Sequence, residues 1–583
     1  MVLSDLYYPY WRVRVDGNEA EIVPAFYIFR AVKVPAGKHS VDFYYKIPYF
    51  NQSVAISLLI FFFSIFAAIY YFKFYRYFKK EEIVRWDSGK AVKNILILCI
   101  IGTLLFTFSQ LRPGSRNPNS PMALQHAQSI SIAISQMKYR LTGYRGYRSV
   151  HELFYSATGQ GDIGAKNHDI NGWIRGALSI KNVSTMGIHY SNHEIGFANY
   201  YKLAFKIFGF NIEGTTYLYF LLLGLSILIF LITFYNDITL MYILMLFVSS
   251  LYVALTSHNV VVEGVTTQRF LPILAILPSF YIALMVLGKY KSNLSKSIFI
   301  SGAVLQSLIL IFIIHVRNST EYQLMFLAGI TVLAILWYWK KERTLKKSFK
   351  NIKFWPLILV LVFFFSQIVY IKIASDEYYN AANKKHPFMQ QIYMGLLASK
   401  YKDISYFNDG VSVKLVMDKA PIYGYIFGAA QVEKFTQGLP LEQKNEIALA
   451  GEEYDSILMQ ECIKMIKDEP LLLVNSLLFK LKVYFQTFFS KDQGFVQNLF
   501  NIPLIVIILN CYFVRIVLGV EWFKYIIILI ISFLFALLPV LATFPIGHSI
   551  IDSGLLLTMI IYTIFSVIII YAINVVEFYF LRF

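Results

Sequence analysis

The chain has 583 residues, of which 57% are hydrophobic, 17% are aromatic and only 15% are charged, and its mean hydropathy is +0.55. A soluble fold of this length would have to bury more apolar surface than its interior can hold, which excludes a soluble globular protein. The net charge of +18 is explained by basic residues that anchor a membrane protein against anionic lipid, so no nucleic-acid partner is required.

The first 52 residues predict a small antiparallel β-module. Trp11–Val15 alternates in polarity and is followed by Asp16 and Gly17, and an Asp-Gly pair between two alternating runs is a strong hairpin signal. A second pair of strands is predicted over Tyr27–Val34 and His39–Tyr45, joined across the Pro-Ala-Gly-Lys segment between them.

This segment resembles the β-module at the C-terminal end of YfhO-type bacterial membrane proteins. The resemblance covers roughly the first 75 residues and rests on Tyr7–Trp11, Val15–Gly17, Phe29–Val32 and Val34–His39. Tyr10 stands where the family usually has glycine, and the module opens this chain but lies near the end of the family's chains. The resemblance implies a multi-spanning protein related to GT-C glycosyltransferases, which are implicated in decorating cell-envelope polymers with sugars.

Eleven apolar runs are long enough to cross a bilayer, which requires about 20 mostly apolar residues. They predict a polytopic α-helical membrane protein with spans near 54–74, 94–111, 215–234, 238–256, 270–288, 297–315, 323–339, 354–374, 502–519, 523–544 and 553–577.

Lysine and arginine gather in the connections after the first and seventh spans, at 73–93 and 340–353. Because cytoplasmic loops retain positive charge, we expect both connections inside, the N-terminal module outside and the C-terminus in the cytoplasm of a bacterial plasma membrane. The start MVLSDLYYPYW predicts no cleavable signal sequence, so either the first span translocates the module or the chain is a piece of a longer protein. The predicted parts are the module (1–52), two spans (53–111), a first outer loop (112–214), six spans (215–374), a large outer loop (375–500) and three spans (501–583).

The first outer loop predicts a helix near 121–140 and, over Asn199–Gly209, an amphipathic helix that ends at glycine and lies along the membrane surface. A long acidic loop followed by such a helix and a span resembles the first periplasmic loop of GT-C glycosyltransferases. That resemblance implies transfer of a sugar from a polyprenyl-phosphate donor to an envelope glycan or lipid.

Such a transfer needs a carboxylate that takes the proton of the acceptor hydroxyl. Asp169 is the first candidate because it lies in a polar turn flanked by tryptophan and glycine, and Asp162 and Glu194 are the reserves. The alternative for each is a helix cap or a solvated loop acid. The class typically has an acid directly after the preceding span, whereas the first acid beyond residue 111 of this chain is Glu152.

Basic side chains would hold the leaving phosphate, and Arg175 and Arg269 are the candidates. Arg269 lies at the mouth of a span, where the alternative is a snorkelling anchor. His168, His386 and Asp409 are candidates for contacts with substrate. No set of metal ligands is predicted, because the histidines are scattered, but a catalytic divalent ion stays an open alternative.

The large outer loop predicts an amphipathic helix over Tyr454–Ile466 that ends before Pro470, and it resembles the late helix-Pro-helix region of GT-C-like envelope proteins. The expected role of the large outer loop is to recognise the acceptor or to support the first outer loop. Two other functions stay open: a transporter or flippase of envelope lipids, and a non-catalytic accessory membrane protein. A transporter should show paired mid-membrane interruptions and an internal repeat, and the sequence shows no repeat.

Overall fold

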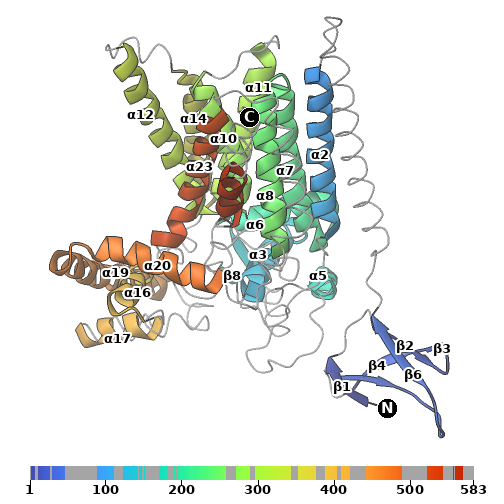
Figure 1. Cartoon of the computed structure of the whole chain (residues 1–583). Helices are drawn as coiled ribbons and strands as arrows, with labels where there is room; N and C mark the ends of the chain where they lie inside the picture. Colours follow the sequence, from blue (N-terminus) through green and yellow to red (C-terminus); the bar gives the residue numbers. More distant parts are fainter. Residues whose placement is uncertain are drawn as a thin grey trace, which may run out of the picture. The chain divides into compact units, whose positions relative to one another are not determined.

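The computed structural model describes residues 2–6, 11–25, 29–45, 88–110, 122–141, 143–147, 150, 170–181, 183, 188–190, 195–257, 271–288, 296–342, 352–375, 388–403, 409–419, 441–488, 522–542, 556 and 558–568. The chain divides into two compact units, Met1–Trp86 and Asp87–Phe583. In the described residues the first unit is built of strands and the second of helices with one two-stranded sheet (Figure 1).

The first unit contains two three-stranded antiparallel sheets, ordered β1-β5-β4 and β3-β2-β6. Val13, Ala31 and Val32 are buried, and the Arg30 guanidinium of β5 lies 4.8 Å from the centre of the Phe43 ring of β6. The strands are β1 (Val2–Leu6), β2 (Trp11–Val15), β3 (Asn18–Ala20), β4 (Ile22–Ala25), β5 (Phe29–Val32) and β6 (Val41–Tyr45).

The Asp-Gly turn is where the sequence predicted it. Asp16 has φ +53° and Gly17 has φ +82°, and Val15 pairs with Asn18 across the turn. Two consecutive positive φ angles match the right-handed twist of a hairpin, and aspartate and glycine tolerate them best. The β2–β3 hairpin is therefore confirmed.

Both strands of the second predicted pair exist, but they do not pair with each other. β5 lies between β1 and β4, whereas β6 pairs along its whole length with β2, from Trp11 opposite Tyr45 to Val15 opposite Val41. The reason lies in the segment before β6, because His39 and Ser40 both bind Asp16 at the end of β2. These contacts align β6 with β2 and leave β5 to the other sheet.

In the described part of the second unit, nine apolar helices coincide with predicted spans. Five of them, α7 (Glu213–Phe234), α8 (Ile238–Ser257), α11 (Lys296–Val316), α12 (Tyr322–Glu342) and α14 (Trp355–Ala374), are long and apolar enough to cross a membrane. Shorter apolar stretches lie in α2 (Ser88–Gln110), α10 (Ile273–Val286), α23 (Trp522–Ala542) and Thr558–Ile568. The predicted runs at 54–74 and 502–519 lie outside the described residues.

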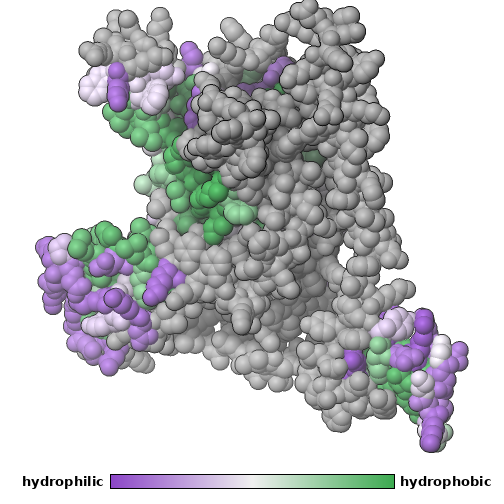
Figure 2. All heavy atoms as spheres, viewed as in Figure 1, coloured by the Kyte–Doolittle hydropathy of each residue, from purple (hydrophilic) through white to green (hydrophobic). Residues whose placement is uncertain are grey.

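The apolar helices differ in how many of their residues are buried by the rest of the protein. Every residue of α10 is buried, whereas Pro356 and Val360 are the buried residues of α14. Figure 2 shows hydrophobic residues gathered on the surface over α12 and α23. On α14 the exposed apolar side chains include Ile358, Leu361, Val362, Phe365, Ile368 and Val369. Continuous apolar exposure of this kind is stable in lipid and not in water, which supports a membrane protein.

Neutral polar side chains join the apolar helices to one another. Ser226 of α7 donates to the Gln306 amide oxygen of α11 at 2.8 Å. Ser279 of α10 donates to the Gln323 amide oxygen of α12 at 2.6 Å, and the Gln323 amide donates to the Ser532 carbonyl of α23 at 3.0 Å. Such mutually bonded pairs hold helices together in lipid, where unpaired polar groups are costly.

The predicted first outer loop supplies α3 (Met122–Met137), β7 (Arg145–Tyr147), α5 (Ile170–Ser179), β8 (Ile188–Tyr190) and α6 (Ile195–Phe208). The helix near 121–140 is confirmed as α3, and α6 is the helix predicted to end at Gly209, whose φ is +82°. However, α6 begins at Ile195, and most of it is buried against α3, α7 and α11.

A separate helical cluster is formed by α16 (Phe388–Tyr401), α17 (Asp409–Lys419), α19 (Leu441–Asp468) and α20 (Leu472–Phe488). Its core contains Tyr393, Val416, Tyr454, Leu458 and Cys462. The amphipathic helix predicted over Tyr454–Ile466 is thus confirmed as the second half of α19, and Pro470 separates α19 from α20.

Candidate functional site

Most of the site residues predicted from the sequence lie outside the described residues: Asp162, His168, Asp169, Glu194, Arg269 and His386. Arg175 is exposed on α5, which packs on α3. Asp409 is the first residue of α17, which packs on α16 and α19. The roles assigned to all eight residues stay predictions.

A polar cluster that the sequence did not indicate lies where α6 meets the C-terminal ends of α11 and α14. It consists of Tyr144, Asn199 of α6, His315 of α11 and Tyr370 of α14, and we call it the Asn199 cluster. The Asn199 amide nitrogen lies 2.9 Å from the Tyr144 hydroxyl and 2.9 Å from His315 Nε2. The two tyrosine hydroxyls are 2.7 Å apart, and the His315 and Tyr370 rings meet edge to face at 5.8 Å.

The directions of these hydrogen bonds follow from the amide orientation in the structure. An amide nitrogen only donates, so Tyr144 Oη and His315 Nε2 both accept from Asn199. A neutral His315 ring then carries its proton on Nδ1. The Tyr144 oxygen accepts from Asn199, and either hydroxyl can donate the hydrogen bond that joins Tyr144 and Tyr370.

Among the described residues the Asn199 cluster therefore has one donor without a partner, the Nδ1–H of His315. His315 is 7% exposed, and its Nδ1 has no partner among the described residues, whereas Tyr370 is 48% exposed. A buried donor without an acceptor costs about 1–3 kcal/mol. An oxygen-rich group at this position would satisfy the His315 donor.

The packing around the cluster fixes its geometry. Gly196 of α6 lies against the His315 carbonyl of α11 so closely that a Cβ atom would overlap it. Tyr144 and Ile195 form a small apolar cluster with Ile371 and Ala374 at the end of α14. The missing side chain of Gly196 thus brings Asn199 within hydrogen-bond distance of His315, since both lie one turn or less from the helix crossing.

A second polar contact links the first loop to α7. The Asn171 amide nitrogen of α5 donates to both carboxylate oxygens of Glu213, at 3.0 and 2.8 Å, and the Ile212 backbone N–H donates to the Asn171 amide oxygen at 2.9 Å. Glu213 lies in the first turn of α7, where the helix dipole favours a negative charge. Asn171 is two residues after Asp169 in the sequence, so this contact anchors the helix that follows the preferred catalytic acid.

Sequence reasoning missed Glu213 and the Asn199 cluster. The available signals were an acid at the entry to a span and a histidine in the last turn of one, both of which are compatible with ordinary capping. The partners of these residues lie between 42 and 226 positions away, and no local pattern indicates them.

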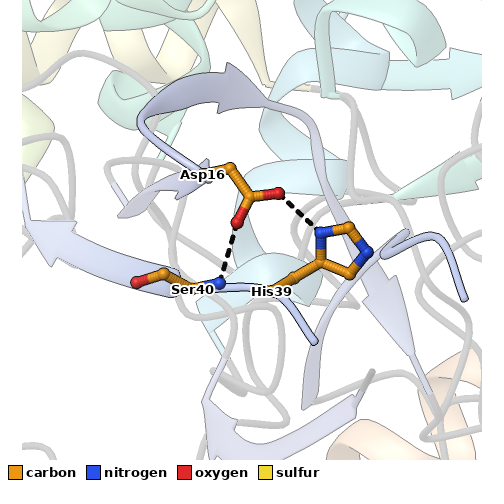
Figure 3. Close-up of polar contacts among 3 residues, drawn as sticks. All are labelled: Asp16, His39 and Ser40. Atoms are coloured by element: carbon orange, nitrogen blue, oxygen red, sulfur yellow. Dashed lines mark hydrogen bonds and ion pairs between the residues drawn. The ribbon is translucent and has the colours of Figure 1, made fainter. Parts of the chain in front are cut away.

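The β-module contains an aspartate–histidine pair, which elsewhere serves in catalysis. His39 Nδ1 lies 2.5 Å from one Asp16 carboxylate oxygen, while the other oxygen accepts from the Ser40 backbone N–H at 2.9 Å. Figure 3 shows both contacts. The hydrogen bond with His39 lowers the pKa of Asp16, and the bond with Asp16 raises the pKa of His39. Both carboxylate oxygens bind the segment before β6 and hold it against the β2–β3 turn. The pair therefore has a structural role.

Metal and thiol chemistry find little support in the described residues. No three of their histidine, cysteine, aspartate and glutamate residues group as metal ligands. Cys462 is buried in the core of the helical cluster, and burial raises the pKa of its thiol to about 12. That thiol stays protonated at neutral pH and is a poor nucleophile.

Comparison of the chain with protein-family models, with curated proteins and with solved structures finds no match. The function proposed below therefore rests on the chain's own residues.

Proposed function

We propose that this chain is a membrane glycosyltransferase that moves a sugar from a polyprenyl-phosphate donor to a cell-envelope glycan or lipid. A lipid-linked donor keeps its tail in the bilayer and its phosphate and sugar at the polar boundary. An enzyme that uses it needs hydrogen-bond donors at the ends of its spans. The observation that carries the proposal is the Asn199 cluster, which lies at the ends of two candidate spans and contains the unpartnered Nδ1–H of His315.

The proposal includes an orientation. We place the Asn199 cluster, the β-module and the helical cluster on the outer face of a bacterial plasma membrane, with eleven spans and a cytoplasmic C-terminus. The basic residues support this orientation. Lys93 Nζ lies 3.4 Å from Asn236 and 5.3 Å from the centre of the Tyr235 ring, both just beyond the C-terminus of α7. The Asn199 cluster lies near the other end, because α6 leads directly into the N-terminus of α7.

In this mechanism Asp169 takes the proton of the acceptor hydroxyl as sugar transfer proceeds, with Asp162 and Glu194 as reserves. Arg175 and Arg269 neutralise the leaving phosphate, while His168, His386 and Asp409 contact substrate. Tyr370 and His315 donate hydrogen bonds to oxygens of the donor head group. The Asn171–Glu213 contact positions α5 beside the entry to α7.

The test uses purified protein in lipid nanodiscs with radiolabelled polyprenyl-phosphate sugars. Asp169→Asn should reduce kcat by at least about 100-fold, which is the lower range for loss of a general base. Tyr370→Phe should raise KM for the donor with little change in melting temperature. The matched controls are Glu453→Gln on the exposed face of α19 and Tyr235→Phe at the other end of α7, and both should retain activity.

Full activity in Asp169→Asn, Asp162→Asn and Glu194→Gln together would reject these residues as the base. A wild-type protein that transfers no sugar but scrambles lipids in vesicles would support the flippase instead. The polar side chains between the described spans do not favour that rival, because Ser226 and Gln306, and likewise Ser279 and Gln323, are neutral and bonded to each other.

A further inference from the structure

Helix α20 has an exposed apolar face that its own helical cluster leaves uncovered. Four of its large apolar residues and Leu471, which directly precedes it, are exposed at 41–69% of their surface. We call these five residues the α20 apolar face: Leu471, Leu473, Val474, Leu477 and Leu478. At 100° per residue all five lie on one side of the helix. The opposite side contains the buried residues Leu472, Ser476 and Lys480.

The buried side of α20 is fixed, so the direction of the exposed side is fixed as well. Ser399 Oγ of α16 donates to Ser476 Oγ at 2.9 Å, and Leu472 belongs to the core of the helical cluster. At the start of α20, Lys400 forms an ion pair with Glu469 at 2.8 Å. Rotating α20 to hide its leucines would break these contacts, so the apolar face is a stable feature of the folded cluster.

The helices and lysines near the α20 apolar face indicate what covers it. α20 packs on α23, one of the helices that coincide with predicted spans, so a bilayer around α23 would reach α20. Met459 and Ile463 of α19 are also exposed, and Figure 2 shows hydrophobic residues along one edge of the helical cluster, over α19 and α20. Lysine follows the apolar residues on both helices, as Lys467 one turn after Ile463 and Lys482 one turn after Leu478.

We propose that the α20 apolar face lies in the surface of the bilayer, among lipid head groups, and that Lys467 and Lys482 contact anionic lipid phosphates. Apolar side chains flanked by lysine are typical of helices that lie in the interface plane, and the 17 residues of α20 are few for a span. The contact holds the helical cluster against the membrane surface. It does not depend on the transferase activity proposed above.

The experiment places a photoreactive benzoylphenylalanine at Leu478 in the full chain, reconstituted in nanodiscs of phosphatidylcholine with or without phosphatidylglycerol. After illumination, mass spectrometry identifies what is attached. Lys414 on the exposed side of α17 is the matched negative position, and Leu361 on the exposed side of α14 is the positive one. We expect several-fold more lipid adduct at Leu478 than at Lys414, with phosphatidylglycerol enriched among the adducts.

The double variant Lys467→Gln/Lys482→Gln should abolish the enrichment of phosphatidylglycerol at Leu478. Adducts between Leu478 and protein instead of lipid would overturn the proposal. So would the absence of lipid adducts there while Leu361 gives them. An unchanged preference for phosphatidylglycerol in the double variant would overturn the role of the two lysines. Each photoreactive variant is compared with wild type by melting temperature, which excludes misfolding as the cause.

Discussion

At the scale of single residues, the number of hydrogen bonds that a polar group makes within the chain distinguishes structural groups from groups that still lack a partner. In the β-module, Asp16 uses both carboxylate oxygens within the chain, and its partners His39 and Ser40 hold the turn. In the Asn199 cluster, His315 Nδ1 has no partner among the described residues. The first pattern indicates a structural role, and the second leaves a donor available for the substrate contact proposed above.

The Asp16–His39 pair makes the β-module sensitive to pH. The pKa of Asp16 is lowered from 3.8 in the folded module. Its contribution to the stability of the module is therefore complete above pH 3.8 and is lost as the pH falls through the pKa of the folded state. The pKa of His39 is raised from 6.5, so its contribution is complete below pH 6.5 and is lost as the pH rises through the folded value. Both contributions are complete only between pH 3.8 and 6.5.

We therefore expect amide hydrogens in residues 11–45 of the full chain to exchange more slowly at pH 5.5 than at pH 8.5, after correction for the intrinsic exchange rate. Hydrogen-exchange mass spectrometry measures this difference. His39→Gln should remove the pH dependence, because glutamine does not titrate. If the variant kept the same dependence as wild type, the pair would not be its source.

At the scale of elements, the crossing of α6 and α11 positions the Asn199 cluster. Gly196→Ala should destabilise the protein by about 1–3 kcal/mol, because the added methyl group overlaps the His315 carbonyl and forces the helices apart. The measurement is thermal unfolding in detergent. It should be accompanied by weaker donor binding, since Asn199 moves with α6.

Gly224 of α7 provides the matched control, because a Cβ atom there meets nothing within 4 Å. Gly224→Ala should leave stability unchanged or raise it by about 0.5–1 kcal/mol, as expected for alanine in a helix. An equal change in the free energy of unfolding in the two variants would show that the crossing of α6 and α11 tolerates a methyl group.

Elements with a local pattern were predicted well. The Asp-Gly hairpin, the helix α3, the glycine end of α6 and the break at Pro470 each follow from neighbouring residues. The partner of β6 was predicted wrongly, because strand pairing depends on contacts between distant residues. The Asp16–His39 contact spans 23 positions and selects β2 over the nearer β5.

At the scale of the whole molecule, the topology can be tested by access to protease. In sealed vesicles with the outer face exposed, protease should cut within residues 1–52 and 375–500 and spare residues 340–353. The expectation follows from the lysine and arginine residues at 73–93 and 340–353, because cytoplasmic loops generally contain more positive charge than outer loops. Cutting of 340–353 in intact vesicles would contradict the orientation, and cutting there after detergent is added is the control for protease access.

The sequence by itself determined that this chain has apolar helices suited to a membrane, a β-module with a tight turn, and an amphipathic helix before Pro470. These properties are set by composition and by periodicity over a few residues, so they can be derived without a fold. Only the tertiary structure decided that Asn199, His315 and Tyr370 meet, that Gly196 permits it, and that α20 leaves an apolar face uncovered. Those facts depend on which helices pack together, and the residues that decide the packing are far apart in the chain.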